Sequence, residues 1–132
     1  MIVLDTHALY WIATGERKLG RACRARVDQA LEDDGLSVSV ISFWELAMLA
    51  QKKRIAANDI EEMRRIALES GITELQLDGP TAILAAQLDS GHKDPADRFI
   101  AAAALRHRAT LVTADERLLA GVPGLTLQDA RL

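Results

Sequence analysis

The stretch that decides the fold runs from His92 to Leu105 and reads HKDPADRFIAAAAL. Its second half is alanine-rich and almost wholly apolar, which predicts a helix buried on most of its sides. Asp94 followed by Pro95 is typical of a helix start, where the aspartate caps the first turn. Asp97 then falls within that first turn, where the helix dipole favours an acid. The two aspartates are therefore either helix caps or part of a site.

Short apolar strands and amphipathic helices alternate on both sides of this stretch. Strands that alternate with helices predict a parallel sheet covered on both faces, which is a three-layer α/β/α sandwich. Besides the helix of the opening stretch, the pattern predicts strands at 2–4, 36–41, 72–77, 109–113 and 125–128, and helices at 6–15, 21–35, 42–54, 58–70, 79–91 and 114–121.

Several residues predict where individual helices begin and end. Gly35 is expected to close the helix before the second strand. Ser42, with Glu45 three residues later, has the spacing of a capping box at the start of the following helix. Asn58 or Asp59 is expected to cap the next one.

The composition fits one folded domain over residues 1–132. Hydrophobic residues make up 49% of the chain and charged residues 27%, as in an ordinary globular protein. The net charge of -3 excludes a general basic field that attracts nucleic acid. The single cysteine, Cys23, excludes an internal disulfide, suits a reducing cytoplasm and is interpreted as a packing residue or as incidental. No secretory signal or membrane-spanning segment is predicted.

Acidic residues recur where the predicted strands end. Asp5 ends the first strand, Glu45 follows the second, and Asp115 follows the strand at 109–113. Together with Asp97, they could meet at one edge of the sheet, because ligands of open α/β sheets bind beyond the carboxyl ends of the strands. Four distant segments of the chain thus deliver carboxylates to one predicted region.

Each acid also has a structural alternative. Glu45 can complete the capping box, Asp94 can cap its helix, and Asp97 can interact with the helix dipole. Asp5 and Asp115 can cap the helices that follow them. No single acid decides between these roles.

The acids as a group favour a metal site. Carboxylates that converge on one pocket repel one another, and a divalent cation offsets that repulsion. Oxygen ligands suit Mg²⁺ first and Mn²⁺ next, and no Cys/His pattern indicates zinc. Metals held by carboxylates serve hydrolysis at phosphorus, and their charge also allows an acidic protein to handle a phosphodiester backbone.

Four fragments in order resemble the motifs of the PIN-domain family, and more closely its VapC-type ribonuclease toxins. LDTHALYWIATG resembles the opening strand and acid, and VSVISFWELA the motif whose Trp-Glu supplies a metal ligand. DPADRFIAAAAL resembles the third motif and LVTADERL the fourth. The resemblance covers nearly the whole chain.

This resemblance implies a Mg²⁺-dependent endoribonuclease with a PIN-like fold, in which water attacks the phosphorus of single-stranded or exposed loop RNA. It also implies a homodimer in the cytoplasm and a cognate VapB-type antitoxin whose C-terminal segment covers the site. Position by position, it implies catalytic and metal-binding roles for Asp5, Glu45, Asp97 and Asp115, with support from Thr6, Ser42 and Thr113, an assisting or capping role for Asp94, and a phosphate contact or an ion pair for Arg98.

The sequence departs from the family pattern beyond the second motif, where many relatives carry Lys at the place of Leu49 and Gly at that of Lys53. The basic run 52–54 is either a solvated helix end or a patch that binds an RNA backbone. Trp11 and Trp44 are interpreted as core or dimer contacts in preference to platforms for base stacking. His7 and His92 flank acid motifs and could touch the substrate, but they are interpreted mainly as hydrogen-bonding residues.

Two other functions are compatible with this size and pattern. A phosphoacceptor signalling domain needs an acid pair after the first strand and a lysine after the fifth. Asp5 has no acidic neighbour, and the C-terminal LTLQDARL has no lysine. A non-catalytic α/β interaction module whose acids serve only as caps is the other alternative, and a lack of stabilisation by Mg²⁺ would distinguish it.

Overall fold

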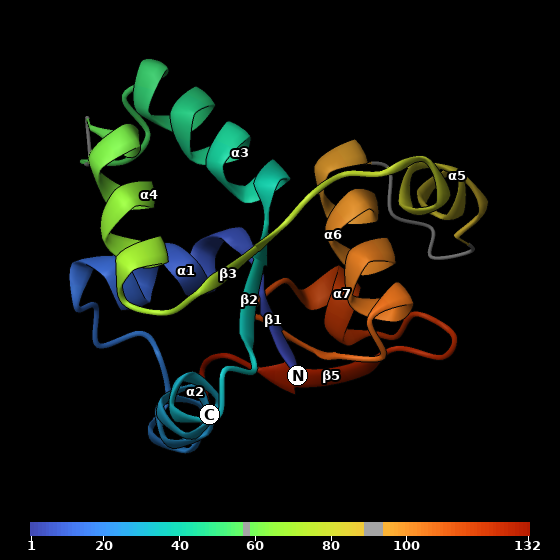
Figure 1. Ribbon diagram of the computed structural model, residues 1–132, viewed down its shortest axis with the longest axis horizontal. Helices are drawn as coiled ribbons and strands as arrows, with labels where there is room; N and C mark the ends of the chain where they lie inside the picture. The colour runs from blue at the N-terminus through green and yellow to red at the C-terminus, as the bar shows by residue number, and fades with distance from the viewer. Residues whose placement is uncertain (57–58, 89–93) are drawn as a thin grey trace.

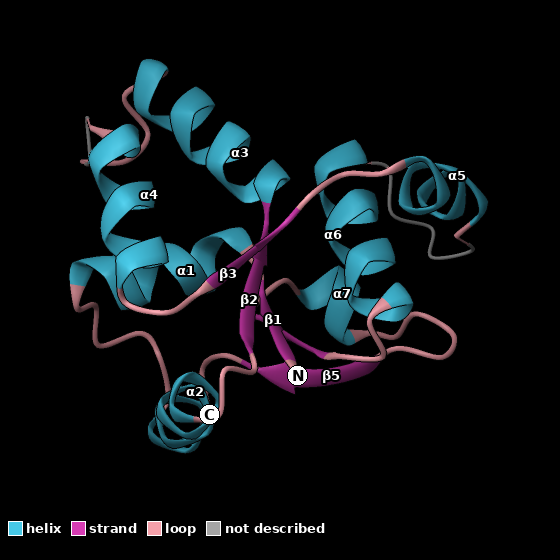
Figure 2. Cartoon of the chain, in the orientation of Figure 1, coloured by secondary structure: helices cyan, strands magenta, loops and turns pink. Residues whose placement is uncertain are grey.

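A parallel sheet of five strands forms the centre of the molecule (Figure 2). The structure is a computed structural model and describes residues 1–56, 59–88 and 94–132. The strand order is β3-β2-β1-β4-β5, and every neighbouring pair is parallel. The strands are β1 (Ile2–Leu4), β2 (Leu36–Ser39), β3 (Thr73–Leu75), β4 (Thr110–Thr113) and β5 (Thr126–Asp129).

Helices cover both faces of this sheet, so the fold is the predicted three-layer α/β/α sandwich. The first four helices lie on one face and the last three on the other (Figure 1). The helices are α1 (Thr6–Thr14), α2 (Arg21–Glu32), α3 (Val40–Gln51), α4 (Ile60–Glu69), α5 (Gly79–Gln87), α6 (Pro95–Arg106) and α7 (Glu116–Leu119).

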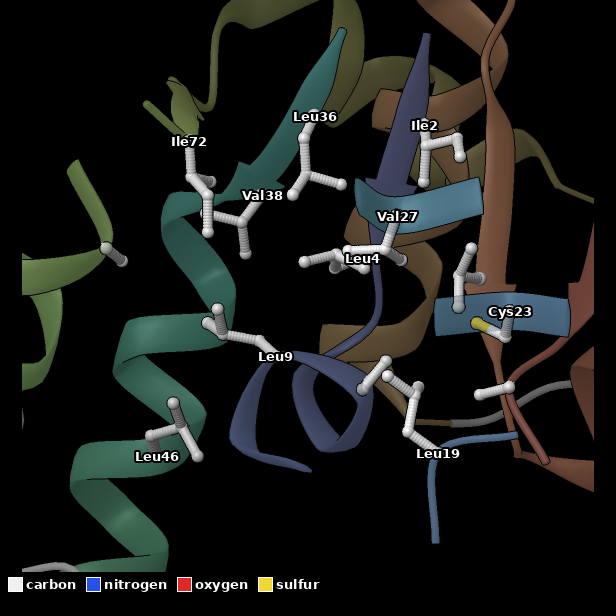
Figure 3. Close-up of a cluster of buried hydrophobic side chains, with 14 of the residues drawn as sticks. Ile2, Leu4, Leu9, Leu19, Cys23, Val27, Leu36, Val38, Leu46 and Ile72 are labelled. Carbon is white, nitrogen blue, oxygen red and sulfur yellow. The ribbon is translucent and has the colours of Figure 1, made fainter. Parts of the chain in front are cut away.

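The alternation of side chains along each strand divides the core in two. In β1, Ile2 and Leu4 contact the core under α1–α4, whereas Val3 contacts the core under α6 and α7. This is the two-residue period of a strand whose faces are both buried. The first of these cores includes Leu9 of α1 and Leu46 of α3 (Figure 3). Cys23 is buried in the same core as a free thiol, which fits its interpretation as a packing residue.

The helix of the opening stretch is buried as its alanines predict. The residues from Ile100 to Ala104 in α6 are each less than 5% exposed, and all of them except Ala102 belong to the same core cluster as Val3. Within the parts of the chain that the structure describes, no helix is both long enough and apolar enough to cross a bilayer.

The second strand is shorter than predicted, and the predicted capping box is wrong. β2 ends at Ser39, whose hydroxyl caps α3 by accepting a hydrogen bond from the Ile41 backbone N–H. The β-branched pair Val40 and Ile41 satisfies a strand pattern, but both residues lie in the first turn of the helix. Ser42 is therefore inside the helix and fully buried, which frees Glu45 from the capping role.

The end of α2 also differs by one residue from the prediction. Asp34, not Gly35, adopts the left-handed conformation, with φ of 55°. The Gly35 N–H donates to the Ala30 carbonyl and the Asp34 N–H to that of Leu31, which is the Schellman pattern. An aspartate replaces glycine here because its short polar side chain tolerates this conformation.

The remaining boundaries differ by only a few residues. Asp59 caps α4 by accepting from the Glu62 N–H, whereas the alternative cap, Asn58, lies outside the described residues. α5 ends at Gln87, and both its predicted end and His92 lie outside the described residues. Lys53 has φ of 56°, in the left-handed region that glycine adopts without strain.

Candidate metal centre

The site lies where the strand order reverses. The chain adds β2 and β3 on one side of β1 and β4 and β5 on the other, so the carboxyl ends of β1 and β4 flank a crevice. Asp5 follows β1 directly, and its backbone N–H donates to the Val112 carbonyl. Thr113, the last residue of β4, donates its hydroxyl to Asp5 Oδ2 at 2.6 Å. The fold thus fixes this carboxylate at the switch point.

Asp5 has a capping role as well as a place in the crevice. Its Oδ1 accepts from the Thr6 N–H at 2.7 Å, at the start of α1. The side chain is only 5% exposed. Both carboxylate oxygens therefore have hydrogen-bond donors, which hold the side chain in one orientation.

Glu45 reaches the same crevice from α3. Its Oε1 accepts from the Thr6 hydroxyl at 2.5 Å, and the same hydroxyl lies 3.1 Å from Ser42 Oγ. Because Thr6 is the first residue of α1, it connects the helix after β1 with the helix after β2.

The start of α6 brings Asp97 and Asp94 to this edge. Asp94 caps the helix by accepting from the Ala96 N–H at 3.0 Å, and Asp97 lies in the first turn with 8% of its surface exposed. Arg98 turns toward α5, where its guanidinium donates to the carbonyl oxygens of Ala85, Ala86 and Leu88. Arg98 therefore ties α6 to α5.

Asp115 lies at the rim and caps α7. Its Oδ1 accepts from the Arg117 N–H at 2.8 Å, and its own N–H donates to the Thr113 hydroxyl at 3.0 Å. Thr113 thus accepts from Asp115 and donates to Asp5. This relay places Asp115 beside the buried acid but leaves it outside the closest group of carboxylates.

That closest group is formed by Asp5, Glu45 and Asp97. Each offers one carboxylate oxygen, and these oxygens all lie within 4.8 Å of one another. They open into a cavity of about 350 Å³ that Asp94 and Asp115 also line. Of the four acids expected as ligands, the structure therefore groups three closely and places the fourth on the wall of the same cavity.

Burial and mutual repulsion raise the pKa values of these three carboxyl groups. Burial first, and then the negative charge of Asp5, raises the pKa of Asp97 to about 8. Burial also raises the pKa of Asp5, although the hydrogen bonds from Thr113 and Thr6 oppose it. The pKa of Glu45 is raised for the same reason, with the Thr6 hydroxyl opposing. Three acids held together against such repulsion are expected where a cation compensates.

The residues present fit a hard divalent cation. All three close donors are carboxylate oxygens, which is the ligand type of Mg²⁺ and Mn²⁺. Two of them are oriented by threonine hydroxyls, Thr113 on Asp5 and Thr6 on Glu45. Such outer hydrogen bonds fix the direction of metal ligands.

Two residues that were not among the predicted site residues also line this cavity. His7 and Trp11 contribute to its wall together with the acids. Trp11 was expected in the core or at a dimer contact, and it does pack partly on the core. The signal that could have found both residues is their spacing of four on α1, which places them on the same helix face as one another.

The fold and the acidic crevice together define a PIN domain. Residues 2–124 match the PIN domain family, and the chain belongs to that family. It is 34% identical over 123 residues to Ribonuclease VapC22 of Mycobacterium tuberculosis (strain ATCC 25618 / H37Rv), and the aligned part covers 89% of this chain and 88% of that relative.

Solved structures of toxin–antitoxin complexes share the fold. VapBC2 from Rickettsia felis, bound to a DNA fragment from its promoter, matches with a TM-score of 0.73 and 18% identity over 97% of this chain and 98% of that one. DNA-bound VapBC from Salmonella typhimurium gives a TM-score of 0.71 and 20% identity over 97% and 96%. A toxin–antitoxin complex from Klebsiella pneumoniae gives 0.66 and 25% over 98% of each chain.

Proposed function

We propose that this PIN domain is a metal-dependent endoribonuclease and the toxin of a VapBC-type toxin–antitoxin system. The observation that carries the proposal is the group of three carboxylates, Asp5, Glu45 and Asp97, at the switch point of the sheet. The 34% identity to a VapC ribonuclease over most of both chains supports the RNA substrate. Residues 1–132 act as one domain in this proposal.

Asp5, Glu45 and Asp97 would hold Mg²⁺, or Mn²⁺ in its place, with Asp115 available on the same wall. A cation bound there would activate water and neutralise charge on the scissile phosphate. Thr113 and Thr6 keep two of the carboxylates aimed into the cavity.

The described lining offers no activated side-chain nucleophile. Its one hydroxyl, that of Thr6, donates its proton to Glu45, so water is the attacking group in this mechanism. Asp94 and Asp115 add negative charge to the cavity wall, which increases its attraction for a cation. Their backbone-capping bonds hold them in place.

The proposed partners are an RNA substrate, a VapB-type antitoxin and a second copy of the chain. The antitoxin follows from the relatives, whose structures are toxin–antitoxin complexes. A toxin that acts on cellular RNA works in the cytoplasm, and the free thiol of Cys23 suits that compartment.

The test is RNA cleavage by the purified chain free of antitoxin. Wild-type protein with Mg²⁺ should cleave single-stranded RNA, and EDTA should stop the reaction. Asp5→Asn and Asp97→Asn should be inactive while they melt cooperatively. Equal cleavage by the wild type and both variants would rule out this site as the source of the activity.

A further inference from the structure

Two aromatic rings form part of the wall of the acidic cavity. The described residues that line it are five acids, Thr6, Ala114, His7 and Trp11. His7 and Trp11 are four residues apart on α1, so their side chains lie one above the other on one face of the helix. The cavity therefore combines a carboxylate group with an aromatic surface.

The residues that line the cavity indicate how a phosphate and a base would each be recognised. Among the described residues of the wall there is no lysine or arginine, so a bound cation would be the main partner of a phosphate. The ring N–H groups of His7 and Trp11 can each donate a hydrogen bond, but the flat faces of these rings match those of a nucleobase. A volume of about 350 Å³ suits a ligand of about the size of one nucleotide.

We propose that Trp11, with His7 beside it, stacks on the unpaired base next to the scissile phosphate. This inference rests on the proposed ribonuclease function and specifies what the enzyme selects. Base–aromatic stacking contributes about 5- to 150-fold in binding per base, and it tolerates any base. Trp11 thus selects for an unpaired, unstacked base and not for a particular base identity. A base inside a duplex is already stacked and paired.

Trp11 is partly anchored in the core. The side chain is half-buried and packs on the core under α1, where Ala114 also packs. Its carbonyl accepts from the N–H groups of Gly15 and Glu16, which close the end of α1. One part of the residue is thus fixed by the core while another part lines the cavity.

The chain offers a matched control in its second tryptophan. Trp44 lies on α3, is 54% exposed, and is not among the described residues that line the acidic cavity. Trp44→Phe leaves Trp11 as the only tryptophan, and Trp11→Phe leaves Trp44. The fluorescence of each indole can therefore be followed alone.

The first test is a titration with adenosine 5′-monophosphate in the presence of Mg²⁺, with ribose 5-phosphate as the ligand that lacks a base. AMP should quench the fluorescence of the Trp44→Phe variant, and ribose 5-phosphate should not. The Trp11→Phe variant should respond to neither ligand. If AMP leaves Trp11 fluorescence unchanged, or quenches both single-tryptophan variants alike, the proposal is overturned.

The second test uses an RNA that the wild type cleaves, with an abasic residue placed on either side of the scissile phosphate. At one of these positions, loss of the base should lower kcat/KM of the wild type by about 5- to 150-fold. Trp11→Leu should lose a similar factor on intact RNA and should be insensitive to the abasic change. Trp44→Leu should behave as the wild type.

These outcomes separate the two proposals. If the wild type cleaves no RNA, the ribonuclease function fails, and the AMP titration still decides whether Trp11 stacks on a base. If RNA is cleaved but Trp11→Leu and the abasic change have no effect, stacking fails and the nuclease stands. Retention by Trp11→Leu of the stabilisation that Mg²⁺ gives the wild type shows that its fold and acids are intact.

Discussion

Helix α1 separates two cavities of similar size and opposite chemistry. One of its faces lines the acidic cavity of about 350 Å³ through Thr6, His7 and Trp11. The other lines a larger cavity of about 450 Å³ through Leu9 and Ile12, across from α4. The three helices of this region, α1, α3 and α4, lie on one side of the sheet (Figure 1).

The comparison shows that the larger cavity is not the one whose residues fit a catalytic site. The larger cavity follows from the spacing of two helices, and its wall is mostly apolar, with Asp59 and Glu62 at the start of α4. The acidic cavity follows from the ends of β1 and β4, where the fold delivers carboxylates from distant segments. Only the acidic cavity should therefore carry the catalysis.

The largest contrast should come from the same substitution in each cavity. Glu45→Gln should lower RNA cleavage at least about 100-fold, because it removes one of the three close carboxylates while keeping the side-chain shape. Glu62→Gln, on the wall of the apolar cavity, should keep cleavage within about twofold of the wild type. Initial rates at several Mg²⁺ concentrations provide the measurement, and comparable losses in both variants would contradict the assignment.

A smaller effect is expected from the hydroxyl that joins the two helices at the site. Thr6→Val removes the donor to Glu45 and should lower cleavage or metal affinity by about 10- to 100-fold. Thr14→Val is the control on the same helix, since the Thr14 hydroxyl donates only to the Tyr10 carbonyl at the exposed end of α1. A Thr6→Val enzyme with wild-type kcat/KM would show that this hydroxyl does not orient Glu45.

The pH dependence of stability should reveal the acid group in the metal-free protein. The pKa of Asp97 rises from 3.8 in the unfolded chain to about 8 in the folded one. The folded state therefore holds a proton that the unfolded state releases, so this stabilisation is complete below pH 3.8 and is lost as the pH rises through 8.

The melting temperature of the metal-free protein should accordingly fall by several degrees between pH 5 and pH 9. The melting temperature of Asp97→Asn should fall less over the same pH range, because this variant has no carboxyl group at position 97 to titrate. Saturating Mg²⁺ should restore much of the loss at high pH, because the cation favours the ionised carboxylates. Identical pH profiles for the wild type and Asp97→Asn would contradict the raised pKa.

The smallest effect is expected in the apolar cavity. Ile66 of α4 lines it, but the side chain is 54% exposed. Ile66→Ala should change the free energy of unfolding by only about 0.5 kcal/mol and leave RNA cleavage unaltered. Urea unfolding and the same cleavage assay provide the two readouts. A loss of cleavage in this variant would mean that the two cavities are coupled through α1.

Much of the fold was predictable because hydrophobic periodicity is local. The alternation of strands and helices and the burial of the alanine-rich helix both follow from neighbouring residues. The end of β2 was not predictable from the sequence, because Val40 and Ile41 suit a strand as well as a first helical turn. In the structure the Ser39 hydroxyl caps the helix by accepting from the Ile41 N–H, and the strand ends there.

The acids of the candidate site were predictable from the sequence, but which of them lie closest together was not. A capping acid and a ligand look alike in sequence, and the structure shows that Asp5 caps α1 and also faces the crevice. The closer grouping of Asp5, Glu45 and Asp97, with Asp115 on the wall, depends on the strand order. Trp11 was interpreted as a core or dimer contact because an apolar residue on a helix gives no sign that part of it also lines a cavity.

Three carboxylates, from α3, α6 and the end of β1, should bind one divalent cation together. Titration of the metal-free protein with Mn²⁺, with the free ion followed by electron paramagnetic resonance, tests it most directly. We expect the wild type and Asp59→Asn to bind Mn²⁺, and Asp5→Asn, Glu45→Gln and Asp97→Asn to bind it at least about tenfold more weakly. Wild-type affinity for Mn²⁺ in those three variants would contradict the account.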